Sequence, residues 1–556
     1  MKMLLIGFNV ILLLCGLCWG RTVKTPVFSN TYTTRGTLYI PYAEIEEPFY
    51  AWFDGSNGRS RIDYYGDMVK TYQLSTEGPY GSSIKIAPVT TENEINKQTC
   101  LQVNGTKETK ILPQTIIPDT TGMECNGEEM IFGIMAEKWK FTEVIEEKKN
   151  EYTLWIRYVK SSKQPKLKEP VPIKYEMRGF NTLLGSHYDH YYLTYDYYDF
   201  EVPNDNVFQV DKNSSCVSFP GPGIDHVYTF NPMHEFIHNY DHHVNNIFDE
   251  FKTQHNKSYD NELEHHKRKI QFKHNLRYIH SFNRAGLSFQ LKMNHLADRF
   301  NEELRHLYGK QYTKPSEKST EGLLPFEHNV AKEKDDLPET WDWRISGAVT
   351  PVKDQSVCGS CWSFGSTGAV EGAYFMKHKR LVRLSQQALI DCSWGFGNNG
   401  CDGGEDFRSY QWIMKHGGLP TEDEYGGYLG QDGLCHIDNV AKVAKLKGFV
   451  NVKANDLDAL KLAIFKHGPV SVAIDASHKT FSFYSNGVYY EPSCGNTEEN
   501  LDHAVLAVGY GTLNGQGYWL IKNSWSNYWG NDGYILMAQK NNNCGVMTAP
   551  TYAVAA

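Results

Sequence analysis

A small set of side chains in the second half of the sequence could together attack a carbonyl group. Cys361 is followed by residues 362–372, which are predicted to be helical, so its sulfur is expected at a helix N-terminus, where free backbone N–H groups stabilise a thiolate. His503 begins an apolar, strand-like run and could hold the proton and deliver it to a leaving amine. Asn523 could orient the imidazole, and Trp525 could shield that hydrogen bond from water. A lone histidine beside a strand is usually structural, but these residues together favour catalysis.

Cysteine parity points to the same sulfur. Of 12 cysteines, Cys15 and Cys18 lie in an apolar N-terminal segment, and the other ten are expected in an oxidising compartment. Three of these lie in the first half and seven lie from Cys358 onward. Both counts are odd, so each region is predicted to hold one cysteine that is not bridged within it, and Cys361 is the candidate in the second half. For the first half we expect a Cys100–Cys125 bridge, with Cys216 left over.

The residues around Cys361 carry a family signature. Gln355-Ser-Val-Cys358-Gly-Ser-Cys361-Trp362 contains C-G-[SA]-C-[WY], with histidine 503 − 361 = 142 residues and asparagine 523 − 361 = 162 residues downstream. On these motifs, residues 338–556 resemble a papain-like cysteine protease, closest to the cathepsin L group. The resemblance implies an α+β fold with a helical lobe and a β-barrel lobe. It implies that Cys361 is the nucleophile and His503 the general acid and base, oriented by Asn523 under Trp525, with Gln355 donating to the oxyanion.

The same resemblance implies further pairs and subsites. It implies the disulfides Cys358–Cys401, Cys392–Cys435 and Cys494–Cys544. Gly403 and Gly404 would pair with the substrate backbone, and the walls of the pocket for the second residue before the cut would be Glu405, Asp406, Ala473, Leu501, Ala504 and Ala549. Many relatives have apolar residues at the first two of these positions. The two carboxylates here either accept basic side chains or point to solvent. No paired-histidine insertion of the cathepsin B kind is present, which favours an endopeptidase.

The region before the protease-like segment is predicted to be helical and inhibitory. Val244, Ile247, Phe248 and Phe251 recur at helical spacing, and a second helix is predicted over residues 262–282. Residues 240–309 resemble a papain-type propeptide, through a motif formed by Glu264, Arg268, Phe272, Asn275, Ile279 and Asn283. The resemblance implies a zymogen whose propeptide runs through the cleft against the substrate direction until low pH loosens its charged contacts. Residues 310–337 are polar and weakly patterned, which predicts an exposed activation linker where cutting frees the enzyme.

The first part of the chain is predicted to be a separate β-rich domain. Residues 1–20 have the pattern of a cleaved signal peptide, and residues 21–235 are dense in aromatic and β-branched residues, weakly resembling half-barrel lipoprotein carriers. Six tyrosines between residues 188 and 198 suggest either a ligand surface or, as we favour, paired strands with stacked rings. Predicted glycosylation acceptors are Asn104, Asn213 and Asn256.

A rival motif lies at residues 234–238. His234-Glu235-Phe236-Ile237-His238 matches H-E-x-x-H, in which two histidines hold zinc and the glutamate acts as a base. The glycine and third histidine of the metzincin pattern are absent. We therefore favour an incidental or pH-sensing histidine cluster, and no metal or cofactor is expected.

Composition narrows the function further. The 556-residue chain has a formal net charge of −9 and a mean hydropathy of −0.51, which disfavour nucleic-acid binding and stable membrane insertion. We therefore expect a cysteine endopeptidase made as a zymogen, acting through a thiolate–imidazolium pair and an acyl-enzyme in an acidic lysosomal or secreted compartment. Its expected partners are protein or peptide substrates, its own propeptide and a retained N-terminal fragment. The order of segments resembles that of the insect haemocyte 26/29 kDa proteinases.

Overall fold

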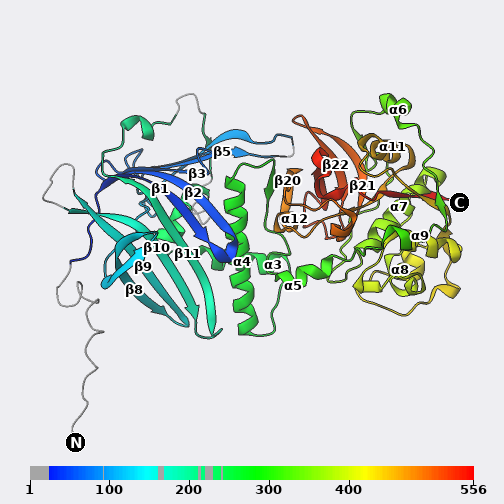
Figure 1. Cartoon of the computed structure of the whole chain (residues 1–556), viewed down its shortest axis with the longest axis horizontal. Helices are drawn as coiled ribbons and strands as arrows, with labels where there is room; N and C mark the ends of the chain where they lie inside the picture. Colours follow the sequence, from blue (N-terminus) through cyan, green and yellow to red (C-terminus); the bar gives the residue numbers. More distant parts are fainter. Residues whose placement is uncertain (1–23, 92, 161–167, 211–214, 220–228, 240–241) are drawn as a thin grey trace, which may run out of the picture. The chain divides into compact units, whose positions relative to one another are not determined.

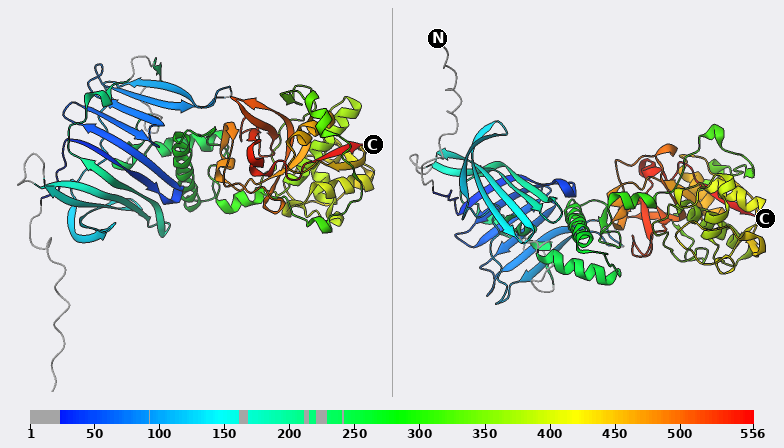
Figure 2. Two further views of the ribbon diagram at one scale, coloured as in Figure 1. Left: turned by 45° about the horizontal axis from the view of Figure 1, so that its top comes forward. Right: turned by 90° about the horizontal axis from the view of Figure 1, so that it is seen from below.

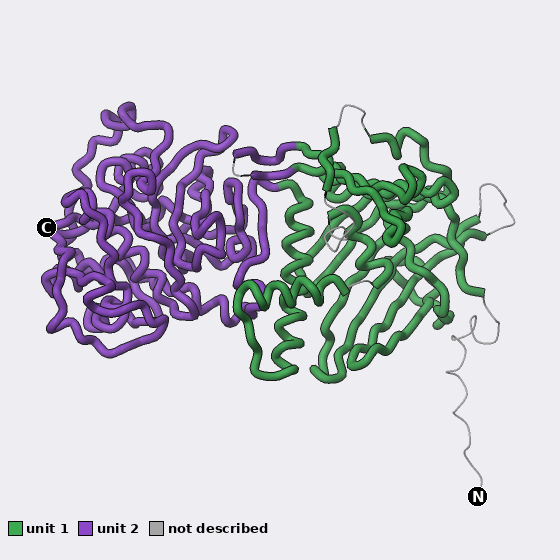
Figure 3. The backbone as a smooth tube through the Cα atoms, turned by 180° about the vertical axis from the view of Figure 1, so that it is seen from behind, with its two compact units in different colours: residues 1–88, 98–286 green, residues 89–97, 287–556 purple. Residues whose placement is uncertain are grey.

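The chain forms two compact units, which are described separately below. The computed structural model describes residues 24–91, 93–160, 168–210, 215–219, 229–239 and 242–556, so the predicted signal peptide and Asn213 lie outside the described residues. One unit contains residues 1–88 and 98–286, and the other contains residues 89–97 and 287–556 (Figure 3). The division falls inside the predicted propeptide, at residue 286. Within the described part of the chain, no helix has the length and apolar character needed to cross a bilayer.

The first unit is built on one twelve-stranded sheet (Figures 1 and 2). The order of strands across the sheet is β12-β6-β5-β4-β3-β2-β1-β11-β10-β9-β8-β7. Strands that lie side by side in the sheet are consecutive in the chain except at two places, where β1 pairs with β11 and β12 pairs with β6. The strands are β1 (Thr31–Ile40), β2 (Ile45–Asp54), β3 (Arg59–Tyr64), β4 (Val69–Leu74), β5 (Ser82–Val89), β6 (Lys97–Asn104), β7 (Glu124–Ile131), β8 (Ile134–Ile145), β9 (Lys148–Lys160), β10 (Lys168–Asn181), β11 (Ser186–Asp199) and β12 (Val217–Ser218). The β-rich prediction is confirmed.

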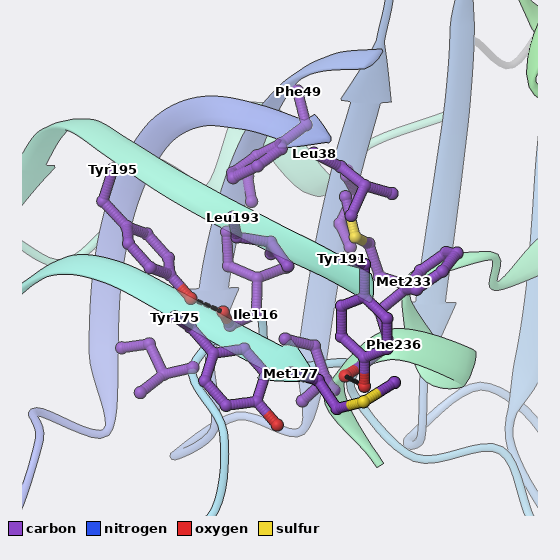
Figure 4. Close-up of a cluster of buried hydrophobic side chains, with 14 of the residues drawn as sticks. Leu38, Phe49, Ile116, Tyr175, Met177, Tyr191, Leu193, Tyr195, Met233 and Phe236 are labelled. Atoms are coloured by element: carbon purple, nitrogen blue, oxygen red, sulfur yellow. Dashed lines mark hydrogen bonds between the residues drawn. The ribbon is translucent and has the colours of Figure 1, made fainter. Parts of the chain in front are cut away.

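The tyrosine-rich strand β11 supplies part of the core of this sheet. Tyr191 and Tyr195 are buried, and Figure 4 shows them among apolar side chains of β1, β2, β10 and α2. Their hydroxyls donate to the carbonyls of Phe236 (3.0 Å) and Ile116 (2.7 Å), which satisfies the polar ends of two buried rings. On the other face of β11, Tyr192 stacks on Tyr39 with ring centroids 4.7 Å apart. The favoured prediction of paired strands with stacked rings is confirmed.

Three helices complete the first unit. They are α2 (Met233–Ile237), α3 (His242–Gln254) and α4 (Glu262–Arg284), and Asn261 caps α4 by accepting from the N–H of Glu264. Val244, Phe248 and Phe251 of α3 are buried, and Phe248 and Phe251 pack on Phe272 of α4 at 5.1 and 4.9 Å between ring centroids. Both predicted helices are confirmed.

A second face of α4 is charged and buried against the sheet. Arg277 donates to Asp189 of β11 and to Glu235 of α2, each at 2.7 Å, and Lys273 donates to the other oxygen of Asp189 at 2.7 Å. Two turns later Arg284 pairs with Glu47 of β2. Burial alone would raise the pKa of Asp189, but Arg277 and Lys273 hold it well below its usual range. The inhibitory helix is therefore fixed to the β-rich domain by buried ion pairs.

Covalent features of the first unit differ in part from expectation. Cys100 of β6 is bonded to Cys216, so the expected Cys100–Cys125 bridge was wrong. Residues 217–218 pair with residues 101–102, which brings Cys216 beside Cys100, a long-range contact that sequence spacing does not reveal. Asn104 and Asn256 are both exposed, as glycosylation acceptors must be.

The second unit joins a helical part to a ten-stranded sheet. The helices longer than one turn are α7 (Cys361–His378), α8 (Gln386–Cys392), α9 (Asp406–Lys415) and α11 (Leu457–His467), and the shorter ones are α5 (Asn301–Leu304), α6 (Val330–Glu333), α10 (Glu422–Tyr425) and α12 (Lys479–Ser482). The sheet order is β13-β20-β23-β22-β21-β19-β24-β18-β14, with β15 added on β21, and β16 (Leu419–Pro420) pairs separately with β17 (Lys442–Ala444). The bounds of the sheet strands are β13 (Phe289–Leu291), β14 (Leu323–Leu324), β15 (Trp341–Asp342), β18 (Leu446–Asn451), β19 (Val470–Ile474), β20 (Tyr484–Tyr489), β21 (His503–Leu513), β22 (Gln516–Lys522), β23 (Tyr534–Ala538) and β24 (Thr551–Ala555).

The buried charges of α4 give a stability prediction. Arg277→Leu leaves Asp189 and Glu235 without their shared partner, and breaking a buried pair in this way typically costs about 3–5 kcal/mol. We expect amide hydrogen exchange in residues 262–284 to accelerate at least about 100-fold in full-length chain, measured by mass spectrometry. The matched control is Arg178→Leu, since Arg178 is more than half exposed and its partner Glu176 would keep its pair with Lys174. Equal exchange in the two variants would contradict a structural role for the Arg277 pairs.

Candidate active site

Cys361 is the first residue of α7, as the sequence predicted. Its side chain is fully buried, and its sulfur accepts from the backbone N–H of Ala504 at 3.4 Å. Ala504 follows His503 on β21, so this contact brings the start of the helix and the start of the strand together. The next residue, Trp362, is also buried, and its indole N–H donates to the Gly400 carbonyl at 3.1 Å.

His503 is the first residue of β21 and is fully buried. Its Nε2 is 2.8 Å from Oδ1 of Asn523, which lies directly after β22, the partner strand of β21. The Trp525 indole lies over this pair, with its ring centroid 4.9 Å from that of His503. Because Asn523 occupies Nε2, Nδ1 is the nitrogen that can exchange a proton with the thiol.

Gln355 is fully buried, and its side-chain amide is fixed at both ends. Its amide oxygen accepts from the hydroxyl of Ser524 at 2.6 Å, which turns its amide nitrogen towards the cleft. That nitrogen donates to the carbonyl of Leu307 at 3.0 Å and to the carbonyl of Cys358 at 2.9 Å. The geometry is that of a hydrogen-bond donor aimed at a carbonyl oxygen beside the nucleophile.

The cleft is filled by residues 307–313 of the chain itself, here called the cleft segment. The N–H of Gly309 donates to the Cys361 sulfur at 3.3 Å, and the N–H of Lys310 donates to the Asp502 carbonyl at 2.9 Å. Gly404 donates to the Gly309 carbonyl at 2.9 Å and accepts from Gln311 at 3.0 Å, which forms a parallel bridge between Lys310 and Gly404. The cleft segment thus covers the sulfur, and its Leu307 carbonyl accepts the hydrogen bond that the Gln355 amide donates.

Glycine is required where the two backbones meet. Gly403 has φ +110, and a Cβ there would lie 2.7 Å from the Gly309 carbonyl oxygen. A Cβ on Gly309 would lie only 1.7 Å from the Gly359 carbonyl oxygen. Sequence analysis named Gly403 and Gly404 but missed Gly309, whose only signal is a glycine within an otherwise bulky run, Leu-Tyr-Gly-Lys.

The residues expected to line a substrate pocket differ in burial and in their partners. Ala473, Leu501 and Ala504 are buried, and Ala549 is half-buried. Glu405 is 2% exposed and does not point to solvent: Arg408 donates to it at 3.1 Å, and so do the N–H and hydroxyl of Thr313. Asp406 accepts from the Thr551 hydroxyl at 2.6 Å and from the Phe407 N–H at 2.8 Å. Both carboxylates therefore already have partners in this state.

Burial sets the charge state of the reactive pair. It raises the pKa of the Cys361 thiol to about 11, although the N–H groups of Ala504 and Gly309 oppose this. It lowers the pKa of His503 to about 4, although the Asn523 bond opposes this. With the cleft segment in place, the pair is a neutral thiol and a neutral imidazole near neutral pH. Burial outweighs the helix N-terminus that the sequence led us to expect would favour the thiolate.

The second unit contains three disulfides. They are Cys358–Cys401, Cys392–Cys435 and Cys494–Cys544, the pairs implied by the resemblance. Among the described residues, Cys361 is the free cysteine. The bridge at Cys358 fixes the loop before α7 to the loop that carries Gly403.

The H-E-x-x-H motif is not arranged as a zinc site. Glu235 is committed to Arg277, while His234 and His238 both contact the side chain of Gln114, at 3.3 and 3.2 Å. Helix α2 ends at residue 237, so the second histidine lies outside it. The geometry supports the interpretation of an incidental cluster over catalytic zinc.

The predicted linker, residues 310–337, is exposed or partly exposed and is also bound to the second unit at several points. Leu323 and Leu324 form β14, which pairs with β18, and Lys318 forms an ion pair with Glu498. Gln411 of α9 donates to the carbonyl of Glu321 at 3.0 Å. Most of the side chains stay partly exposed, which explains the polar composition, while the backbone supplies the contacts that composition does not reveal.

The fold and the site together define a thiol protease of the papain type, held inactive by its own chain. A sequence model described as papain family cysteine protease matches residues 337–554, and one described as cathepsin propeptide inhibitor domain (I29) matches residues 248–304. A cathepsin L-like peptidase of Aedes aegypti is 47% identical over 310 residues, covering 54% of this chain and 91% of the relative. Digestive cysteine proteinase 1 of Homarus americanus is 43% identical over 317 residues, covering 56% of this chain and 94% of the relative.

Solved structures agree with this assignment. Digestive procathepsin L2 proteinase from Tenebrio molitor larval midgut has a TM-score of 0.51 and 34% identity, covering 56% of this chain and 99% of that structure. The chain belongs to the papain family of cysteine proteases. It is a cathepsin L-like endopeptidase with an inhibitory propeptide.

The raised thiol pKa predicts a pH slope for alkylation. In the unprocessed chain, iodoacetamide labelling of Cys361 should rise about tenfold per pH unit between pH 6 and 9, because the thiolate is the reacting form and its fraction grows with pH below a pKa of about 11. After processing, labelling at pH 6 should be at least about 100-fold faster. Mass spectrometry of the labelled peptide measures both, with Cys361→Ala as background. A flat profile in the precursor would contradict a neutral buried thiol.

The close approach of Gly309 predicts a leaky variant. Gly309→Ala places a methyl group 1.7 Å from the Gly359 carbonyl oxygen, so the cleft segment must move away from the sulfur. Labelling of Cys361 in the unprocessed chain at pH 7 should rise at least about tenfold. Gly427→Ala is the matched control, since a Cβ there meets nothing within 4 Å. Unchanged labelling in Gly309→Ala would show that this residue does not cover the sulfur.

Proposed function

We propose that the processed enzyme hydrolyses peptide bonds through a Cys361 thiolate and a His503 imidazolium. The observation that carries the proposal is the cleft segment itself: a Leu307 carbonyl faces Gln355 and a peptide N–H faces the sulfur. A substrate peptide that replaced this segment would offer its own carbonyl to the same donor.

The chemistry then follows from the residues in place. The thiolate adds to the scissile carbonyl carbon, and the negative charge that develops on the oxygen is stabilised by the Gln355 amide and the Cys361 backbone N–H. His503 gives its proton to the amine as the carbon–nitrogen bond breaks, which leaves a thioester on Cys361. The same imidazole then takes a proton from water as the water attacks the thioester, and the acid product leaves. Asn523 keeps the ring oriented throughout.

Loss of the cleft segment also restores the charge state that this chemistry needs. Burial is the largest cause of both pKa shifts, and the removed segment supplies part of that burial. Exposure to water lowers the thiol pKa and raises the imidazole pKa, and the thiolate–imidazolium pair then stabilises itself. We propose that this happens in an acidic lysosomal or secreted compartment, after a cut within residues 310–337.

We propose that the N-terminal fragment stays bound after that cut. Strand β13 pairs with β20 over three residues, and β14 pairs with β18, so both sides of the cut keep backbone hydrogen bonds to each other. Among the described residues, no disulfide joins residues 24–309 to residues 338–556. Retention would therefore be non-covalent and reversible. Gel filtration of processed enzyme, with and without reductant, distinguishes this from a covalent link.

The Gln355 geometry predicts a defect in turnover. Gln355→Ala in the processed enzyme should lower kcat about 10²–10³-fold with little change in KM, because the donor acts mainly on charge that develops in the transition state. Cys361→Ala should abolish hydrolysis of a peptide substrate. Gln431→Ala, at an exposed glutamine outside the site, serves as the control and should match wild type. Hydrolysis that survives Cys361→Ala would rule out the thiolate mechanism.

A further inference from the structure

A pair of histidines joins the end of the propeptide to the catalytic domain. His328 lies in residues 325–336, here called the clasp segment, which directly precedes the predicted mature N-terminus near Leu337. His467 is the last residue of α11. Their Nε2 atoms are 2.6 Å apart, so one must donate a hydrogen and the other must accept through its lone pair.

The surroundings decide which ring carries the first proton. Nδ1 of His328 is 2.9 Å from the carboxylate of Glu333, which also accepts from the Asn329 N–H at 2.9 Å. A proton on His328 is therefore balanced by Glu333. His467 instead stacks flat on Tyr552 of β24, with ring centroids 4.3 Å apart, next to Lys466 on its own helix. Glu327 adds a negative charge near Tyr552.

The second proton has no place in this arrangement. If His328 carries the shared proton, the acceptor is Nε2 of His467, and that lone pair is the site at which His467 would be protonated. Protonation of both rings removes the hydrogen bond and places two positive charges in contact. Lys466 adds a further positive charge beside the two imidazolium ions. Glu333 contacts the opposite nitrogen of His328, so it does not separate the two rings.

We propose that His328 and His467 form an acid-sensitive clasp, which holds the clasp segment on the catalytic domain at neutral pH and releases it for cutting in weak acid. The inference rests on the proposed function, since it names how access to the activation cut is controlled. It adds a specific pair to the general expectation that low pH loosens the propeptide.

The size of the effect follows from linkage. Burial, followed by the charge of His328, lowers the pKa of His467 to about 4 in the closed state, against about 6.5 for a free histidine. A histidine whose pKa is lower in the closed state than in the open state stabilises the closed state fully above pH 6.5. This stabilisation is lost as the pH falls from about 6.5 towards about 4. Between pH 7 and pH 5 the open population should therefore rise on the order of 20-fold.

The test separates opening of the clasp from catalysis. Full-length chain with Cys361→Ser cannot process itself, so cutting of the clasp segment by added proteinase K reports its exposure. The rate is divided by that for a synthetic peptide of residues 322–340 at each pH, which removes the pH dependence of the added protease. This ratio should rise roughly 20-fold from pH 7 to pH 5.

A second substitution shows whether the histidine pair is responsible. His467→Phe in the same background keeps the stack on Tyr552 but cannot titrate, and the ratio should change less than about threefold. His378→Phe, at an exposed histidine of α7, is the matched control and should keep the full rise. His328→Asn provides a second variant of the pair and should give a shallower rise than the parent.

The outcomes are distinct from those of the proposed function. An undiminished rise in His467→Phe, or a loss in His378→Phe, would overturn the clasp while leaving the thiolate mechanism intact. A dead processed enzyme would overturn the mechanism, yet the proteinase K ratio would still report on the clasp. Circular dichroism of each variant at pH 7 verifies that a change in the ratio does not come from misfolding.

Discussion

The state of this protease depends on whether the sulfur of Cys361 is a thiol or a thiolate, and two features of its surroundings act in opposite directions. At the N-terminus of α7 the backbone favours a thiolate, yet complete burial under the cleft segment raises the thiol pKa to about 11. The same burial keeps His503 neutral. Inhibition therefore comes from desolvation as well as steric blockage, because the segment that blocks the cleft also removes the water that a thiolate–imidazolium pair needs.

The inhibitory helix α4 serves two partners, and this explains its unusual composition. Phe272, Leu276 and Ile279 form the apolar contacts expected of a propeptide helix, while Lys273, Arg277 and Arg284 lie buried against carboxylates of the first unit. A helix with this many buried charges gains less from apolar burial, so its position depends on the complementary acids that β2, β11 and α2 provide. The long N-terminal extension thus acts as a scaffold for the propeptide within its own unit.

The sequence could predict what local spacing encodes and little beyond it. Cys361 at a helix start, His503 at a strand start and the two propeptide helices follow from short patterns, and β11 from its tyrosines. The partners of Arg277, 42 and 88 residues away, could not be read from any local pattern, nor could the Cys100–Cys216 bridge across 116 residues. Residues 310–337 are exposed or partly exposed, as their polar composition predicted, but composition could not reveal that parts of this segment also bind the second unit.

Two kinds of group in this precursor respond to weak acid: histidines that are held neutral by burial, and the buried Asp502, whose pKa desolvation raises to about 7. The paired acids are already far from titrating in weak acid: Lys174 and His190 help lower the pKa of Glu176 to about 2 against its burial, and His478 does the same for Asp475. Their ion pairs persist at pH 5, so low pH does not loosen them. Buried neutral histidines behave in the opposite way, since His274 and His280 have pKa values near 3 and lose folded-state stability as soon as the pH falls below the free value of about 6.5. Weak acid therefore acts where an imidazole is held neutral by burial, and at Asp502.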